Sequence, residues 1–380
     1  MPKKKIVYII GTRPEIIRSA TIISLLKEDQ EVDFRLVHTG QHYDYSMDKV
    51  FFEEFGLPEP DINLSCGSGS HAEQTADIMV KLDKFFQEFN PDIVAVFGDT
   101  NSSLAAAITS IKMQIPLAHI EAGCREWEMD MPEEVNRRLI DHCSNVNMTV
   151  SKLCSENLLS EHVAGDVIFT GDPLFDVYQR CRKECAHQNI AEKFGIVGGD
   201  YALITTHRGK NVDNIESLEG ILKAMSHYPS TKFIFPVHPR TKKHLEDLND
   251  FKKKYPNVIM VEPLNYRETI NLVVGSKFVI TDSGGLQKEV FWSGKPCITI
   301  REHTAWVETV DLGVNILVKP EYENMVEKID YVIANYDEIL EKFKTSGDPY
   351  SPDGGNITET IIKKLKEYSG KRWSNTTFQK

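Results

Sequence analysis

The sequence predicts an α/β protein made of two doubly wound domains that face each other across a cleft. Short apolar runs alternate with amphipathic helical patterns along the first half of the chain, and a second alternating series follows Gly198-Gly199-Asp200. The chain has 380 residues, which suits two domains of α/β size better than one core. We therefore expect an N-terminal domain of residues 1–171, a C-terminal domain of residues 172–355, and a final segment of residues 356–380.

The first series contains short apolar runs that we interpret as strands. They are Lys5–Ile10, Asp33–His38, Asp92–Phe97, Ile115–Ile120, Val146–Val150 and Val167–Thr170. Between them, apolar residues recur with helical spacing over Glu15–Lys27 and Ala72–Phe89.

The second series repeats this organisation after the connector that ends near Asp200. Its expected strands are Tyr201–Thr205, Lys232–Val237, Val258–Glu262, Lys277–Thr281, Pro296–Ile300 and Asn315–Val318. After the loop Gly347–Gly355, the pattern of Asn356–Tyr368 predicts an amphipathic helix that can dock on either domain.

Composition and charge narrow the class of protein. The chain is 41% hydrophobic and 26% charged, and no apolar run approaches the length of a membrane span. The apolar stretch before Gly11 is too short for a secretory signal, so we expect a cytoplasmic protein whose seven cysteines are reduced thiols. A net charge of −12 argues against a nucleic-acid surface, and an anionic ligand would need basic groups gathered locally.

The spacing Cys181-x-x-x-Cys185-x-His187 raises the question of a metal site. Metal sites usually have a fourth ligand and tighter paired spacings. Because Arg182, Lys183 and Glu184 lie between the thiols, we interpret the segment as a solvated helix and expect no metal.

Three acids follow apolar runs within forty residues of one another: Asp99, Glu121 and Glu133. Residues at the carboxyl ends of parallel strands gather at the crevice where doubly wound sheets bind ligands. Such acids can supply both a base and an acid to one substrate, so the pattern favours an enzyme. For the adjacent Glu134 we expect a solvent-facing or helix-N-terminal acid without a catalytic role.

Two strand-to-helix junctions have the composition of anion sites. Gly11-Thr12-Arg13-Pro14-Glu15 follows the first strand but lacks both the dinucleotide glycine spacing and a P-loop lysine. Thr281-Asp282-Ser283-Gly284-Gly285 opens a helix in the second half, where Ser283 can cap the helix and donate to a phosphate. A plain capped helix with no ligand is the alternative at each junction.

Two more strand ends of the second half carry a histidine beside an arginine, in Thr206-His207-Arg208 and Val237-His238-Pro239-Arg240-Thr241. Such a pair can contact a diphosphate or move a proton near neutral pH. Together with the glycine-rich junction, they favour a nucleotide diphosphate as the ligand.

Taken in order, these motifs resemble the UDP-N-acetylglucosamine 2-epimerases. The matching segments are GTRPE, HTGQH, GDT, HIEAG, PEExNR, THR, PxHPRT and TDSGGLQKE, from about Lys5 to the end of the second domain. The resemblance implies two Rossmann-like domains in the GT-B arrangement, with the C-terminal helix packed back on the first domain. It also implies a homodimer that acts on a UDP-sugar without NAD or metal.

The implied reaction interconverts UDP-N-acetylglucosamine and UDP-N-acetylmannosamine. UDP leaves by anti elimination to give a 2-acetamidoglucal, and it then adds back by syn addition with proton delivery to the other face of C2. By motif position, the resemblance assigns catalysis to Asp99, Glu121, Glu133 and His207. It assigns substrate and UDP binding to Arg13, Arg18, Arg137, His238, Ser283, Gly284, Gly285, Glu289 and Arg301.

Some relatives bind a second UDP-N-acetylglucosamine as an activator, and the resemblance places Gln41, His42 and Arg208 at that subsite. This chain has Gly69-Ser70 where such relatives carry an Arg-Gln pair, which weakens the expectation of activation. The segment Arg301–Thr309 resembles a variant found in archaeal members and in epimerases of diacetamido-uronic acids.

Four alternatives therefore remain open from the sequence. They are a hydrolysing epimerase that releases UDP and N-acetylmannosamine, a 2-epimerase of a modified UDP-sugar, a GT-B glycosyltransferase, and a non-enzymatic nucleotide-sugar sensor.

Overall fold

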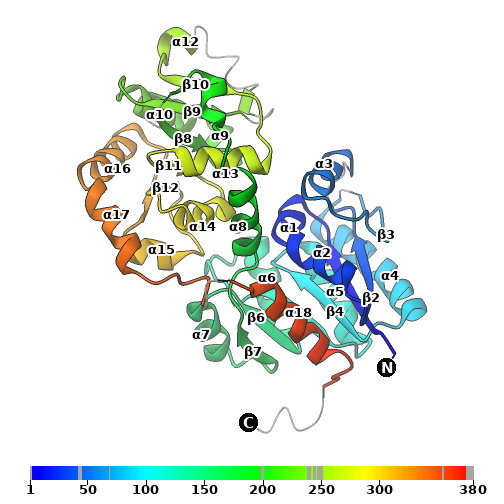
Figure 1. Ribbon diagram of the computed structural model, residues 1–380. Coiled ribbons are helices and arrows are strands. Elements are labelled where there is room, and N and C mark those ends of the chain that lie inside the picture. Colours follow the sequence, from blue (N-terminus) through cyan, green and yellow to red (C-terminus); the bar gives the residue numbers. More distant parts are fainter. Residues whose placement is uncertain are drawn as a thin grey trace. The chain divides into compact units, whose positions relative to one another are not determined.

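The computed structural model describes residues 2–41, 45–67, 69–197, 201–237, 241–242, 245, 251–352 and 355–373, with the backbone alone for 45–48. The chain divides into two compact units. Unit 1 comprises residues 1–177 and 348–380, and unit 2 comprises residues 178–347. Figure 1 labels most elements of both units and colours the chain from blue at the N-terminus to red at the C-terminus.

Unit 1 is built on a parallel sheet. Its described part has seven strands in the order β3-β2-β1-β4-β5-β6-β7. They are β1 (Lys4–Ile10), β2 (Val32–His38), β3 (Ile62–Asn63), β4 (Ile93–Phe97), β5 (Leu117–Ala122), β6 (Val146–Thr149) and β7 (Asp166–Phe169). Since β1 pairs with both β2 and β4, the winding reverses between β1 and β4, and the loops after these two strands part to leave a crevice.

Helices cover both faces of this sheet because each crossover between parallel strands places a helix on one face, and the winding reverses between β1 and β4. They are α1 (Arg13–Arg18), α2 (Ala20–Glu28), α3 (Tyr45–Phe55), α4 (His71–Phe89), α5 (Asn101–Lys112), α6 (Pro132–Cys143), α7 (Lys152–Ser160), the start of α8 (Leu174–Glu184), and α18 (Ile357–Tyr368). One core cluster joins Val7 and Val94 of the central strands to Ile78 and Phe86 of α4. The small residues 105–107 of α5 allow that helix to lie close to the sheet.

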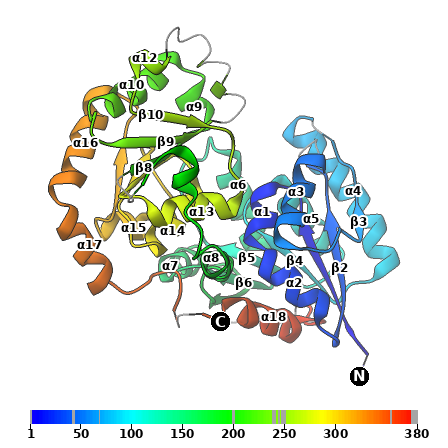
Figure 2. The ribbon, with the colours of Figure 1, turned by 45° about the horizontal axis from the view of Figure 1, so that its top comes forward.

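The C-terminal helix α18 belongs to unit 1, where it packs against α2 and β4. Ile361 and Leu365 are completely buried, and the hydroxyls of Thr358 and Thr21 lie 2.8 Å apart. Figure 2 shows α18 in red beside α2. Among the described helices, none has the length and apolar character that a membrane span requires.

Unit 2 repeats the doubly wound arrangement. Its described strands form one parallel sheet in the order β10-β9-β8-β11-β12-β13. They are β8 (Tyr201–Thr205), β9 (Lys232–Pro236), β10 (Val258–Val261), β11 (Val279–Thr281), β12 (Cys297–Ile300) and β13 (Asn315–Val318). Here the winding reverses between β8 and β11, so the loops after these two strands border the crevice.

The described helices of unit 2 are mostly short. They are the rest of α8, the 3-10 helix η1 (Ile190–Phe194), α9 (Gly209–Val212), α10 (Ile215–Ser226), α12 (Phe251–Lys254), α13 (Tyr266–Gly275), α14 (Gly284–Trp292), α15 (Val307–Asp311), α16 (Tyr322–Ala334) and α17 (Tyr336–Thr345). The helices α10 and α16 pack together on one face of the sheet (Figure 2).

The expected strands are all present, with ends that differ by no more than two residues. Two details differ from the expectation. The helix predicted over Glu15–Lys27 is interrupted at Ser19, whose buried hydroxyl lies 2.8 Å from the hydroxyl of Tyr8. The strand β3 was not predicted because it has only two residues and no apolar run; pairing with Val37 and His38 defines it.

Candidate functional site

Asp99 lies at the crevice of unit 1, two residues after the end of β4. Gly98 has φ 62°, a left-handed conformation that turns the chain out of the sheet. Oδ2 of Asp99 lies 2.5 Å from Nη2 of Arg137, and the Asp99 carbonyl accepts a hydrogen bond from Nδ2 of Asn136 at 2.9 Å. Burial acts to lower the pKa of Arg137, but the Asp99 carboxylate and other nearby acids outweigh it and raise that pKa. Arg137 is therefore a permanent cation beside a carboxylate that remains one-third exposed.

The second expected acid, Glu121, lies inside β5 and not beyond its end. It has φ 68°, and the pairing of β5 with β6 shifts register between Ile120 and Ala122. Such a bulge re-aims a side chain at the edge of a sheet. Nη1 of Arg18 donates to both Glu121 carboxylate oxygens, at 2.8 and 3.1 Å. A Cβ added at Gly98 would lie 3.6 Å from Oε1 of Glu121, so the two acids stand on adjacent strand ends.

A pocket of about 210 Å³ lies within unit 1 beside Asp99. It is lined by Thr12, Pro14, Gln41, His71, Asp99, Thr100, Asn101, Pro132, Glu133 and Asn136. Glu133 is exposed in the first turn of α6. The structure therefore brings together two of the expected acids, Asp99 and Glu133, with the expected activator residue Gln41.

The loop after β1 differs from the expectation of free backbone donors. Oε2 of the buried Glu15 accepts hydrogen bonds from the N–H groups of Gly11 at 2.7 Å and Thr12 at 2.8 Å. Burial raises the pKa of Glu15. These two N–H groups of the junction therefore bond within the loop itself. Arg13 is exposed, and its guanidinium lies 5.3 Å from the centre of the Phe51 ring.

Glu134 is an acid for which the solvent-facing interpretation was wrong. Its side chain is fully buried, with Oε2 3.2 Å from Nη1 of Arg137 and Oε1 3.1 Å from Nε of Arg138. It also accepts the N–H of Glu126 at 3.0 Å. Its place in the first helical turn was expected, but its pairing with two arginines needed the packing of α6 against the loop after β5.

In unit 2 the loops after β8 and β11 meet at a buried carboxylate, Asp282. Its Oδ2 accepts hydrogen bonds from the N–H groups of His207 at 3.1 Å and Arg208 at 3.0 Å, and from Nδ2 of Asn211 at 2.9 Å. Burial acts to raise the pKa of Asp282, but His207 and these donors outweigh it and hold the pKa at about 2. Sequence reasoning missed Asp282, although it lies inside the motif that was singled out.

His207 stands at the end of this loop with about half of its side chain exposed. Its Nδ1 lies 3.2 Å from Oδ1 of Asp282. A carboxylate at Nδ1 fixes which ring nitrogen faces outward, so Nε2 is the nitrogen presented for chemistry or binding.

The glycine-rich junction follows on the neighbouring strand. Ser283, Gly284 and Gly285 are half-buried at the start of α14. Ser283 occupies the N-cap position, but its hydroxyl makes no capping hydrogen bond in the described structure. A Cβ added at Gly284 would lie 3.7 Å from Nη2 of Arg301, whose Nε donates to the Asp282 carbonyl at 3.2 Å. The junction thus combines a half-buried helix start with a guanidinium, a combination typical of anion sites.

Glu289 lies one turn further along α14 and is buried. Burial first, and then the Glu289 carboxylate, raise the pKa of the neighbouring Tyr266 hydroxyl. His42 and His238, the remaining expected site residues, lie outside the described residues.

The interpretation of residues 181–187 as a solvated helix is correct for its charged residues and wrong for its cysteines. Arg182, Lys183 and Glu184 are exposed as expected, but Cys181 and Cys185 are buried, with their Sγ atoms 3.8 Å apart. Within the described ranges, no group of three or more His, Cys, Asp or Glu side chains is arranged to hold a metal ion.

Several polar residues of the unit 1 site were not anticipated. His71 and Gln74 of α4 contact Asn101 of α5, with Nδ2 of Asn101 3.0 Å from Nδ1 of His71. Asn136 lies inside the motif PEExNR, which could have identified it as a site residue from the sequence. No motif pointed to His71.

A family model described as UDP-N-acetylglucosamine 2-epimerase matches residues 24–366. A UDP-N-acetylglucosamine 2-epimerase homolog from Methanococcus maripaludis is 41% identical over 95% of this chain and 99% of its own length. A UDP-2,3-diacetamido-2,3-dideoxy-D-glucuronate 2-epimerase from Pseudomonas aeruginosa is 36% identical over 85% of this chain and 90% of its own.

The fold is also found in solved structures. The crystal structure of the Methanocaldococcus jannaschii UDP-GlcNAc 2-epimerase in complex with UDP-GlcNAc and UDP matches with a TM-score of 0.82. That protein is 37% identical in sequence, and the match covers 96% of this chain and 99% of the other. The predicted fold class, two doubly wound α/β domains of GT-B type, is confirmed.

Proposed function

The chain belongs to the UDP-N-acetylglucosamine 2-epimerase family, and we propose that it inverts C2 of a UDP-N-acetylhexosamine without releasing free sugar. The substrate pair is UDP-GlcNAc and UDP-ManNAc. The observation that carries the proposal is the pair of carboxylates on adjacent strand ends, Asp99 and Glu121, each beside an arginine.

The C2 proton of the sugar is weakly acidic, so the reaction avoids a free carbanion. A carboxylate removes the C2 proton, the C–H electron pair forms the C1=C2 double bond, and the C1–O bond breaks to release UDP. UDP then adds back to C1 while C2 receives a proton on the opposite face. The sequence is redox-neutral and balances without an oxidant or reductant.

In this proposal Asp99 and Glu121 carry the proton at C2. Their separate strands are consistent with access to two faces of one ring. Glu133, in the pocket beside Asp99, serves the UDP oxygen that leaves and returns. Arg18 and Arg137 hold the acids in place and contribute positive charge to substrate binding.

Unit 2 supplies the nucleotide contacts in the proposal. Ser283, Gly284, Gly285 and Arg301 bind the diphosphate, His207 acts beside it, and Glu289 accepts the ribose hydroxyls. Arg13 of unit 1 and His238 complete the set of expected UDP contacts. A homodimer in the cytoplasm is part of the same proposal, and sedimentation of the purified protein tests the dimer.

Incubation with UDP-GlcNAc in heavy water tests the reaction. We expect deuterium at C2 of both UDP-sugars, and no free N-acetylmannosamine, by proton NMR. Free sugar together with UDP would identify a hydrolysing enzyme instead. No C2 exchange with any UDP-hexosamine of a panel would contradict the proposal.

A modified UDP-sugar is the second candidate, favoured by the relative that acts on a diacetamido-uronic acid. The same panel therefore includes UDP-2,3-diacetamido-2,3-dideoxy-glucuronate. The substrate with the highest kcat/KM identifies the activity.

Activation by a second UDP-GlcNAc remains a separate proposal for Gln41, His42 and Arg208. Oε1 of Gln41 already accepts hydrogen bonds from Ser102 N at 3.0 Å and Oγ at 2.6 Å. A hyperbolic rate curve in the UDP-ManNAc direction, unchanged by added UDP-GlcNAc beyond product inhibition, would exclude activation.

A further inference from the structure

Behind the two acids lies a buried histidine that the proposed chemistry does not use. His119 of β5 is fully buried, and both of its ring nitrogens have polar partners. Nδ1 lies 2.7 Å from Oδ1 of Asp141, and Nε2 lies 2.8 Å from the carbonyl oxygen of Gly98. Gly98 immediately precedes Asp99, so His119 is bonded to the turn that carries the first acid.

The two partners determine the state of the ring. A carbonyl oxygen can only accept, so Nε2 of His119 carries a hydrogen. Oδ1 of Asp141 also accepts the N–H of Gly123 at 3.3 Å, and Oδ2 forms an ion pair with Nη2 of Arg125 at 2.8 Å. Oδ1 of Asp141 therefore accepts hydrogen bonds while Oδ2 faces a cation, and Nδ1 of His119 donates to Oδ1.

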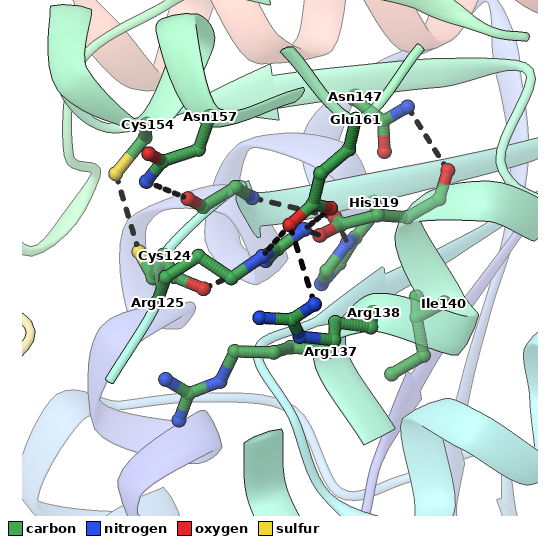
Figure 3. Close-up of polar contacts among 12 residues, drawn as sticks. His119, Cys124, Arg125, Arg137, Arg138, Ile140, Asn147, Cys154, Asn157 and Glu161 are labelled. Carbon is green, nitrogen blue, oxygen red and sulfur yellow. Dashed lines mark hydrogen bonds and ion pairs between the residues drawn. The ribbon is translucent and has the colours of Figure 1, made fainter. Parts of the chain in front are cut away.

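Further charges hold Asp141 in place. Arg125 is bonded to Glu161, with Nε to Oε1 at 2.9 Å and Nη2 to Oε2 at 2.6 Å. Figure 3 shows Arg138 reaching the same Glu161 carboxylate, at 3.7 Å, while Arg137 points away from the cluster. Burial acts to lower the pKa of Arg125, but Glu161 and Asp141 outweigh it and raise that pKa. Such a cluster of buried, paired charges is costly to rearrange.

Asp141 also reaches the strand that carries the second acid. The Gly123 N–H that it accepts lies two residues after Glu121, and Gly123 has φ 78°. A Cβ at Gly123 would lie 2.2 Å from the carbonyl oxygen of Cys154, and the Gly123 carbonyl accepts Nδ2 of Asn157 at 3.0 Å. The end of β5 is thus fixed on both sides.

We propose that His119 and Asp141 are positioning residues: through Gly98 and Gly123 they hold Asp99 and Glu121 in register with each other. This inference rests on the proposed function of the two acids. Gly98 has no side chain to fix its left-handed turn, so the bond to its carbonyl sets the direction in which Asp99 leaves β4. A displacement of about 1 Å at a catalytic group can cost about a hundredfold in rate.

Two substitutions of the same residue separate positioning from simple filling of the core. His119→Gln places an amide N–H near the position of Nε2 and keeps a donor for the Gly98 carbonyl. His119→Asn places its amide near Nδ1, so it keeps the bond to Asp141 and leaves the Gly98 carbonyl without a donor. Both variants lose the same aromatic ring, and Asn is one methylene smaller than Gln, so the free energy of unfolding of each variant is measured alongside its kcat.

We expect His119→Asn to lower kcat about a hundredfold, with KM and UDP affinity within about threefold of wild type. His119→Gln should keep kcat within about tenfold of wild type. In parallel, amide hydrogen exchange over residues 98–101 should accelerate in the Asn variant and not in the Gln variant. Phe86→Leu, in the core at the far end of α4, controls for general loss of stability.

Equal kcat and exchange in the two His119 variants would overturn the proposal, because only His119→Asn removes the donor to the Gly98 carbonyl. Should His119→Asn fail to fold, Asp141→Asn takes its place: it keeps an acceptor for His119 but loses the charge facing Arg125. A wild-type kcat and exchange pattern in Asp141→Asn would also overturn the proposal. Failure of the proposed function is distinguished by the wild-type protein, which would then show no C2 exchange while the two His119 variants still differ in amide exchange.

Discussion

The two units use the same edge of the same kind of sheet for groups of opposite charge. At the crevice of unit 1 the strand ends carry Asp99 and Glu121, and each carboxylate faces an arginine. At the crevice of unit 2 they carry His207, Arg301 and a glycine-rich helix start. The doubly wound fold therefore determines where a ligand binds, and the few residues after each strand determine its chemistry.

A second comparison concerns the buried carboxylates that hold the loops at these crevices. Glu15 accepts two backbone N–H groups of its own loop after β1, and Asp282 accepts two from the loop after the neighbouring strand β8. Burial dominates for Glu15 and raises its pKa, while His207 and further donors hold the pKa of Asp282 at about 2. A buried carboxyl that accepts loop N–H groups thus has a raised pKa in one unit and a lowered pKa in the other.

The largest expected effect tests whether the acid–base chemistry belongs to unit 1 and UDP binding to unit 2. Asp99→Asn or Glu121→Gln should lower kcat about a thousandfold, because general acid–base groups contribute on that order. UDP affinity, measured by calorimetry, should change by less than about threefold, and the exposed Glu88→Gln is the matched control. A loss of UDP affinity as large as the loss of kcat would contradict the assignment of chemistry to unit 1.

The next effect probes unit 2. Arg301→Ala should weaken UDP binding about ten- to a hundredfold, because hydrogen bonds to charged groups contribute about 1.5–3 kcal/mol. We expect kcat at saturating substrate to fall much less, and Arg182→Ala, an exposed arginine of the same unit, to have no effect. Unchanged UDP affinity in Arg301→Ala would remove this guanidinium from the nucleotide site.

The pH dependence of the free energy of unfolding tests the difference between the carboxyl groups of Asp282 and Glu15. A depressed folded pKa means that Asp282 contributes stability above its ordinary value of 3.8 and loses it as the pH falls towards about 2. Asp282→Asn should therefore cost about 2 kcal/mol of unfolding free energy at pH 7 and progressively less between pH 4 and about 2. Urea unfolding at a series of pH values measures this, and a loss independent of pH would contradict it.

The smallest effect is expected at Glu15. Its raised pKa means that the ionised carboxylate opposes folding, so the advantage of wild type over Glu15→Gln should grow as the pH falls. An amide oxygen also keeps an acceptor for Gly11 and Thr12, so the loss at pH 7 should be below about 1 kcal/mol. The same urea series should show opposite pH slopes for Glu15→Gln and Asp282→Asn.

Much of the architecture was predictable from local pattern. The strands are runs of apolar residues buried on both faces, so β1, β4 and β8 stand out from their surroundings without any tertiary information. Ser19 interrupts an otherwise continuous helical pattern through a bond to Tyr8, which no local pattern predicts. The two-residue β3 exists only because β2 offers it a partner.

The candidate site was predictable to the extent that its residues directly follow strands. Asp99, His207 and Ser283 could be named because a buried parallel strand delivers its next residues to the sheet edge. His119 and Asp141 could not, since their roles depend on partners that come from distant parts of the chain. Asp282 also follows its strand directly, but its role as an acceptor for the loop after β8 depends on the tertiary structure.

The amino-acid sequence by itself determined the positions of the strands of both sheets and the charge of the residues that follow them, because these follow from hydrophobic period and short-range turn chemistry. Only the tertiary structure decided which polar groups bond to each other: Glu15 to the loop that appeared open to an anion, Glu134 to two arginines, and His119 to the turn before Asp99. The physical reason is that a hydrogen-bond partner stabilises a buried polar group, and the partner nearest in space is seldom the nearest in sequence.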